Sequence, residues 1–287
     1  MLDNRVIERS YGFMGSRDQY EKAEVVILGV PLEATLSFRP GTRFGPQQIR
    51  QVSVALEEYS LYRNRDLNEV YFFDAGDVSL PFGNLDESLR LIEQAASQLV
   101  LDGKKPIFLG GEHLVSYPLI KALANHYPDL VVLHFDAHAD LRPDYLGQRL
   151  SHATVMRRVS EIVKGINIYQ FGIRSGTREE FAFARENTNL YPVEVLEPLK
   201  KILPMISGRP IYLTLDIDVV DPAYAPGTGT PEPGGCSSRE IMAALHLLQG
   251  QNIVGMDLVE VSPGNDLNDL TSVLGAKLIR EAMLTFW

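Results

Sequence analysis

The sequence is poor in several features that define whole classes of protein. Its 287 residues include a single cysteine, Cys236, which cannot form a disulfide within the chain and fits a reducing compartment. No uninterrupted apolar stretch reaches the roughly 18 residues that a membrane-spanning helix needs, and the first ten residues carry no apolar h-region. We therefore expect a cytoplasmic protein with neither a membrane span nor a signal peptide.

Positive charge is also scarce. The chain has 27 lysines and arginines against 37 aspartates and glutamates, which gives a net charge of −10 at pH 7. Nucleic-acid binders more often show the opposite sign, so we expect no nucleic-acid partner. Hydrophobic residues make up 45% and charged residues 22%, a globular composition that argues against a disordered chain. The excess of carboxylates either keeps the surface soluble or favours a cationic ligand.

The chain has no Ser/Gly-rich linker, charge block or fixed-period repeat, so we expect one domain over residues 1–287. Short β-branched apolar runs alternate with stretches whose apolar residues recur at helical spacing. The predicted strands lie at 24–30, 70–74, 106–109, 130–135, 166–171, 209–215, 253–258 and, more weakly, 191–195, and the predicted helices lie at 85–101, 237–248 and 269–286. The strands are apolar on both faces, which is typical of a parallel sheet covered by helices on both sides. This pattern predicts an α/β fold with about eight mostly parallel strands.

Carboxylates and imidazoles follow three of the predicted strands. They are His113 after the strand at 106–109, Asp136, His138 and Asp140 after 130–135, and Asp216 and Asp218 after 209–215. In an extended segment, alternate side chains share a face, so the members of each cluster can point the same way. In open α/β sheets, ligands bind outside the carboxyl ends of the strands, and all three clusters fall at that edge.

The composition of these clusters indicates a metal centre. One such motif alone is more often a hydrogen-bonding device at the start of a loop, but three converging clusters would bury several carboxylates that need a countercharge. Oxygen ligands with two imidazoles and no thiolate suit Mn²⁺ better than structural zinc. Six side chains are too many for one catalytic ion with open positions, whereas two ions about 3.5–4 Å apart, bridged by carboxylates, account for them.

Several motifs together carry a family resemblance. They are Gly-Gly-Glu-His at 110–113, Asp-Ala-His-Ala-Asp at 136–140, Asp-Ile-Asp-Val-Val-Asp-Pro at 216–222, Pro-Gly-Thr-Gly-Thr-Pro at 226–231 and Asp-Leu-Val-Glu-Val-Ser-Pro at 257–263. With the loop-helix entry at 39–50, they resemble, in order and over roughly residues 24 to 283, the ureohydrolase (arginase/agmatinase) family, and most of all its bacterial agmatinases.

The resemblance implies a three-layer α/β/α sandwich around an eight-stranded parallel sheet, two Mn²⁺ ions per chain, and assembly as a homotrimer or homohexamer. The first ion would be bound by His113, Asp136, Asp140 and Asp216, and the second by Asp136, His138, Asp216 and Asp218. Asp136 and Asp216 would therefore bridge the two ions.

The resemblance also implies roles in catalysis. Glu260 would hold the guanidinium group of the substrate, His152 would carry a proton to the leaving amine, and Thr230 would help to line the site. Asp140 counts among the catalytic residues as well as the metal ligands. The implied reaction is the hydrolysis of a guanidino compound to urea and an amine, in polyamine biosynthesis that leads to putrescine and spermidine.

The identity of the substrate depends on the segment at 141–150. It lacks the Asn/Thr/Ser-rich pattern with which arginases hold the amino and carboxylate groups of arginine. We therefore expect agmatine, a small cationic guanidino compound, with Asp144 as a contact for its amine tail. Aminopropylagmatine, guanidinobutyrate and arginine remain alternatives, and Arg142 and Arg149 keep an acidic tail open.

Two rivals to this interpretation remain. One is a catalytically silent, metal-binding regulatory protein, and the other is an amidohydrolase or formimino-group hydrolase with the same two-metal core. His134, inside the strand predicted at 130–135, is expected to face away from the neighbours of Asp136 and to have a packed, hydrogen-bonded role.

Overall fold

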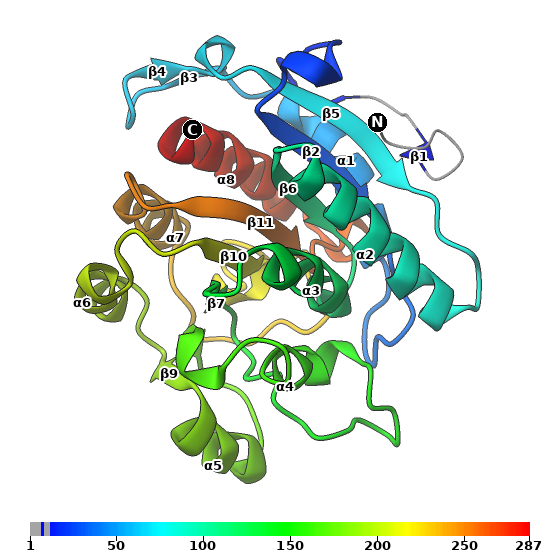
Figure 1. Cartoon of the computed structure of the whole chain (residues 1–287), viewed down its shortest axis with the longest axis vertical. Helices are drawn as coiled ribbons and strands as arrows, with labels where there is room; N and C mark the ends of the chain where they lie inside the picture. The colour runs from blue at the N-terminus through cyan, green and yellow to red at the C-terminus, as the bar shows by residue number, and fades with distance from the viewer. Residues whose placement is uncertain (1–6, 9–11) are drawn as a thin grey trace.

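The computed structural model describes residues 7–8 and 12–287, and a nine-stranded sheet forms its centre (Figure 1). The strands of this sheet are β1 (Ile7–Glu8), β2 (Val25–Val30), β5 (Phe72–Val78), β6 (Lys105–Gly110), β7 (Val131–Phe135), β8 (Ile168–Ile173), β9 (Asn189–Pro192), β10 (Ile211–Asp216) and β11 (Ile253–Val259). They lie in the order β1-β5-β2-β6-β11-β10-β7-β8-β9. Eight strands run parallel, and β1 pairs antiparallel with β5 at one edge. A separate two-stranded ribbon pairs β3 (Tyr59–Ser60) with β4 (Arg65–Asp66).

Helices cover both faces of the sheet. They are α1 (Gly45–Ser53), α2 (Leu85–Leu101), α3 (Ser116–His126), α4 (Val155–Val159), α5 (Arg178–Asn187), α6 (Leu196–Ile206), α7 (Ser238–Leu247) and α8 (Leu270–Phe286). Buried side chains of α1, α6, α7 and α8 pack on one face of the sheet, and those of α2, α3, α4 and α5 pack on the other. The resulting three layers confirm the α/β/α sandwich expected from the sequence (Figure 1). None of the helices in the described ranges combines the length and apolar character that crossing a bilayer requires.

The strands divide their side chains between the two cores because alternate residues point to opposite faces. In β2, Val25 and Ile27 enter one core, whereas Val26 and Leu28 enter the other. Every residue of this strand is buried, as the doubly apolar pattern predicts for a covered parallel strand.

The predicted helix at 85–101 has the bounds of α2, where Asn84 caps the first turn by accepting a hydrogen bond from the N–H of Glu87 at 3.1 Å. The helices predicted at 237–248 and 269–286 match α7 and α8, with Ser237 and Asp269 as their N-terminal flanking residues. The weakly predicted strand at 191–195 overlaps β9, which lies at the sheet edge and is only half-buried.

The order of the strands brings the sequence motifs together. The strands β6, β11, β10 and β7 are consecutive neighbours in the sheet, although they lie far apart in the chain. Because they are parallel, their carboxyl ends meet at one edge. The segments that follow them therefore form a single site.

Candidate metal centre and active site

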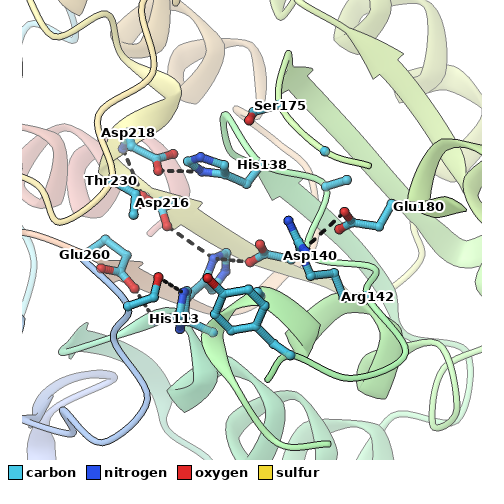
Figure 2. Close-up of a pocket in the computed structure, with 16 residues that line it drawn as sticks. His113, His138, Asp140, Arg142, Ser175, Glu180, Asp216, Asp218, Thr230 and Glu260 are labelled. Carbon is cyan, nitrogen blue, oxygen red and sulfur yellow. Dashed lines mark hydrogen bonds and ion pairs between the residues drawn. The ribbon is translucent and has the colours of Figure 1, made fainter. Parts of the chain in front are cut away.

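A cavity of about 260 Å³ opens at this sheet edge. It is lined by eight of the residues predicted for the site, namely His113, His138, Asp140, His152, Asp216, Asp218, Thr230 and Glu260. Figure 2 shows the imidazoles and carboxylates converging from the ends of neighbouring strands. The predicted ligand Asp136 is fully buried and does not line the cavity.

One half of the cluster surrounds the ring of His113, which begins a short 3₁₀ turn after β6. Its Nδ1 atom lies 3.0 Å from Asp136 Oδ2. It also lies 3.2 Å from Asp140 Oδ2 and 3.2 Å from Asp216 Oδ2, two contacts that Figure 2 shows. Within the described part of the chain, this nitrogen makes no hydrogen bond. A buried nitrogen that has no hydrogen-bond partner and meets three carboxylate oxygens has the chemistry of a divalent-cation site.

The other half of the cluster is built around His138. Its Nδ1 atom lies 2.9 Å from Asp218 Oδ2 and 3.6 Å from Asp136 Oδ1. Among the described residues, Asp218 Oδ2 has no hydrogen-bond partner although it is buried. The carboxylate of Asp136 therefore faces both halves, one oxygen toward each histidine.

Local backbone structure fixes these carboxylates. Asp136 Oδ1 accepts a hydrogen bond from the N–H of His138 at 2.5 Å, and Asp216 Oδ1 accepts one from the N–H of Asp218 at 2.9 Å. Both are turns in which an aspartate bonds the backbone two residues later. Asp140 and Glu260 adopt left-handed φ values of 54° and 63°, and such strain in non-glycine residues clusters at functional sites.

The electrostatics of the cluster favour positive charge. Burial, together with the charge of Asp136, raises the pKa of Asp140 to about 6, and burial with the neighbouring aspartates raises the pKa of Asp216 well above its usual range. Burial lowers the pKa of His138, but the carboxylates of Asp218 and Asp136 outweigh that effect and raise it to about 12. The aspartates destabilise one another and stabilise a nearby cation, so the residues present fit a divalent metal centre.

His134 was expected to face away from the neighbours of Asp136, and this prediction was wrong. Its Nε2 atom lies 2.8 Å from Asp136 Oδ2. Residues 134 and 136 are two apart, so strand alternation places their side chains on the same face. The expected packed, hydrogen-bonded role is confirmed, because the His134 ring is fully buried.

The partners of His134 determine which nitrogen carries its hydrogen. The amide Nε2 of Gln170 donates to the carbonyl of Ala139 at 2.9 Å and lies 3.1 Å from His134 Nδ1, while Gln170 Oε1 accepts from the hydroxyl of Thr188 at 2.9 Å. Nδ1 of His134 therefore accepts a hydrogen bond, and Nε2–H donates to Asp136. This places His134 behind the carboxylate, with its ring nitrogens already used.

A second relay holds His113 from behind. Its Nε2 atom lies 3.0 Å from the hydroxyl of Thr214, which donates to Asp257 Oδ1 at 2.7 Å. Tyr212 donates to the other oxygen of Asp257 at 2.6 Å. Because the Thr214 hydrogen is given to Asp257, His113 carries its hydrogen on Nε2 and turns the lone pair of Nδ1 toward the aspartates.

Glu260 lies directly after β11 and is 4% exposed. Its Oε1 atom accepts a hydrogen bond from the N–H of His113 at 2.8 Å, whereas Oε2 is buried and has no hydrogen-bond partner in the described chain. Burial raises the pKa of Glu260 well above its usual range. One oxygen of this residue is thus anchored, and the other is available to a cationic ligand in the cavity.

His152 also lines the cavity. Its ring packs edge-on against Tyr145, with centroids 5.6 Å apart and planes at 77°. Burial lowers the pKa of His152 to about 4, so the ring is neutral at pH 7. It is therefore an acceptor of protons before it is a donor.

The structure does not bring Asp144 to the cavity. This residue is exposed, and its carboxylate accepts a hydrogen bond from the N–H of Gly147 at 3.2 Å. The cavity is lined instead by Glu180, whose Oε2 atom is 3.6 Å from Arg142 Nε (Figure 2). Sequence reasoning missed Glu180, although Thr177 and Glu180 form a capping box at the start of α5 that the S/T-x-x-E spacing could have revealed.

Comparisons with known proteins agree with this geometry. Residues 23–285 match the sequence model of a protein family described as the arginase family. The agmatinase of Bacillus anthracis is 54% identical over 275 residues, covering 95% of each chain, and that of Bacillus subtilis (strain 168) is 51% identical over 277 residues, covering 96% of each. The solved structure of the agmatine ureohydrolase of Thermoplasma volcanium is similar with a TM-score of 0.88 at 33% identity, covering 97% of this chain and 95% of the other.

Proposed function

The chain belongs to the arginase family, and we propose that it hydrolyses agmatine to putrescine and urea with two bound divalent metal ions. The observation that carries this proposal is one cavity that joins a cation-binding cluster to a separate, unpaired carboxylate oxygen of Glu260. The cluster suits metal ions, and the lone oxygen suits a guanidinium group. A member of this family with those two features is equipped for guanidine hydrolysis.

The metal ligands proposed from the sequence divide into two overlapping sets. His113, Asp136, Asp140 and Asp216 would hold one ion, and Asp136, His138, Asp216 and Asp218 the other. The unpaired Nδ1 of His113 and Oδ2 of Asp218 support the two sets separately. When bound, such ions lower the pKa of water and so supply a nucleophile at neutral pH. Mn²⁺ suits the oxygen-rich donors, and we propose two Mn²⁺ per chain.

Glu260 orients the substrate in this mechanism. Its anchored Oε1 fixes the carboxylate plane, and its free Oε2 accepts a charge-assisted hydrogen bond from the guanidinium. Holding the planar cation against the cluster places its central carbon for attack, which reduces the entropic part of the barrier. Thr230 lines the same cavity and limits the poses that the guanidinium can adopt.

His152 handles the proton. Because its pKa is lowered to about 4, it is neutral before the reaction and can take up a proton as the nucleophile attacks. It then gives that proton to the nitrogen of the leaving amine. For the cationic tail of agmatine, the buried carboxylate of Glu180 on the cavity wall supplies negative charge in place of Asp144, although its oxygens already accept hydrogen bonds from the N–H groups of Leu141 and Thr177.

We also propose that the chain forms one domain and works in the cytoplasm in polyamine biosynthesis, as a homotrimer or homohexamer. Exposed large apolar side chains, such as Phe82 at 99% and Leu61 at 82%, provide surface that such an assembly could bury. The mass of the particle, measured by light scattering, tests the assembly independently of activity.

A substrate panel tests the function. The Mn²⁺-loaded protein is incubated with agmatine, aminopropylagmatine, guanidinobutyrate and arginine at equal concentration, and urea is measured. We expect agmatine to give the highest kcat/KM. A higher value for guanidinobutyrate would move the assignment to an acidic tail, and no urea from any guanidine would leave the catalytically silent, metal-binding alternative.

A further inference from the structure

The contacts of His152 lead away from the cavity to a buried carboxylate that is neither a proposed metal ligand nor a substrate contact. Nδ1 of His152 lies 3.2 Å from the hydroxyl oxygen of Thr35. That hydroxyl donates to Glu112 Oε1 at 2.8 Å. Glu112 has no exposed surface. Thr35 is 77 positions from Glu112 in the sequence and 117 positions from His152. These contacts therefore form only because the fold brings the three segments together.

Glu112 is also held by two hydrogen bonds from the backbone. Its Oε2 atom accepts hydrogen bonds from the backbone N–H groups of Ala34 at 2.7 Å and Thr35 at 2.8 Å. Both oxygens of the carboxylate are therefore bonded to the loop that carries Thr35. Because a carboxylate accepts and does not donate, it determines the direction in which the Thr35 hydroxyl points.

The hydroxyl of Thr35 has one hydrogen, and Glu112 receives it. The lone pairs of the same oxygen face His152, accepting a hydrogen bond from its backbone N–H at 3.0 Å. A ring nitrogen opposite this oxygen must carry a hydrogen, since two lone pairs facing each other repel. The hydroxyl of Ser151, 3.4 Å from the same nitrogen, is a second acceptor for that hydrogen.

The other ring nitrogen then has the free lone pair. Nε2 of His152 lies 3.5 Å from the hydroxyl of Ser37, and both residues line the cavity. The nitrogen that faces the substrate is thus the one able to take up a proton, while Nδ1–H stays on the protein side throughout.

We propose that Thr35 and Glu112 are positioning residues for proton transfer, which hold His152 in the Nδ1–H tautomer and present Nε2 to the leaving amine. This inference rests on the proposed function, in which His152 carries the proton. Overall, the oxygen of water bonds to the guanidinium carbon, the bond from that carbon to the amine nitrogen breaks, and both protons of water end on that nitrogen. One of them passes by way of Nε2.

Two substitutions at one position test the proposal. Thr35→Val removes the hydroxyl and keeps the shape, whereas Thr35→Ser keeps the hydroxyl and is the matched control. Without the hydroxyl, the ring of His152 loses its anchored orientation as well as its fixed tautomer, so kcat for agmatine should fall about 10- to 100-fold in Thr35→Val, with KM within about twofold. Thr35→Ser should keep kcat within about threefold of the parent, and both variants should bind as much manganese as the parent.

The tautomer itself can be measured in the parent protein. In ¹⁵N-histidine-labelled protein, assigned through a His152→Ala variant, the chemical shifts distinguish a protonated from an unprotonated ring nitrogen. We expect Nδ1 protonated and Nε2 unprotonated in the parent and in Thr35→Ser, with a mixture in Thr35→Val. This measurement on the parent does not depend on the folding of any Thr35 variant.

The outcomes separate this inference from the proposed function. If the parent releases urea and Thr35→Val does so with parental kcat, only the positioning role is overturned. A parent ring protonated on Nε2 alone would overturn it as well. If the parent releases no urea from any guanidine, the proposed function is overturned, and the positioning role with it.

Discussion

Replacing Asp136 by asparagine should abolish the binding of both metal ions while leaving the metal-free fold intact. Each oxygen of Asp136 already accepts a hydrogen bond, Oδ2 from the ring of His134 and Oδ1 from the N–H of His138. An asparagine has one oxygen, so its NH₂ group must face one of these two donors. The variant also loses a carboxylate that faces both halves of the cluster.

The expected size of the effect follows from binding linkage. At a free Mn²⁺ concentration 100 times Kd, each ion adds about 2.7 kcal/mol to the free energy of unfolding, and two ions add about 5.4 kcal/mol. For a chain of this size, about 2 °C per kcal/mol converts this to a rise in Tm of about 10 °C. In the metal-free variant, the mispaired amide lowers the free energy of unfolding by about 1–3 kcal/mol. Weaker repulsion among the aspartates partly offsets this loss.

Calorimetry with and without Mn²⁺ measures the rise in Tm, and elemental analysis of the dialysed protein measures the number of bound ions. The parent should bind two ions per chain and show the full rise in Tm, and Asp136→Asn should bind none with a rise below about 3 °C. Asp144→Asn, an exposed site outside the cavity, is the matched control and should behave as the parent. Retention of two ions and of the full rise by Asp136→Asn would refute the shared-ligand reasoning.

Three further substitutions test other parts of the account. Glu281→Gln should lower the free energy of unfolding of the metal-free protein at pH 7 by about 3 kcal/mol, because Arg280 loses its buried carboxylate partner. Hydrogen bonds and the Arg280 charge outweigh burial and lower the pKa of Glu281 to about 2. The contribution of Glu281 to the free energy of unfolding is therefore complete above about pH 4.5 and is lost as the pH falls toward 2. The difference in stability between the parent and Glu281→Gln, measured by denaturant titration, should shrink over the same range. His134→Phe keeps a ring but removes the donor to Asp136, and should weaken Mn²⁺ binding about 10- to 100-fold in a chelator competition; parental affinity would show that the donor is dispensable. Glu260→Gln should lower kcat/KM for agmatine about 10- to 100-fold with two ions still bound, measured by steady-state kinetics and elemental analysis, and loss of the ions instead would place Glu260 in the metal centre.

The parts of the fold that could be predicted are those with a strong local pattern. The strand β2 is apolar on both faces, and α2 combines helical spacing with a capping asparagine, so both are evident in the sequence. Helix α5 was missed because its sequence is dominated by charged residues and only Glu180 and Ala184 are buried. Helix α4 has five residues, too few for a periodic pattern to emerge.

In the candidate site, too, some residues could be predicted from the sequence and others could not. Proposed ligands such as Asp136 and His138 follow strands directly, so their convergence could be predicted from strand parity and parallel topology. The contact of Asp144 with the substrate was an interpretation of charge alone, and the turn that directs this carboxylate to Gly147 leaves it outside the cavity. Relays such as Thr35–Glu112 depend on loops brought together by the finished fold, and no spacing in the sequence reports them.

The most direct test of the central claim follows the guanidino carbon of the substrate. Agmatine labelled with ¹³C at this carbon is incubated with the Mn²⁺-loaded protein and with the metal-stripped protein, and the products are observed by NMR. We expect the loaded protein to transfer all of the label into urea, with one putrescine formed per urea, and the stripped protein to transfer none. Label that stays in agmatine in the presence of two bound ions, or that appears in a product other than urea, would contradict this expectation.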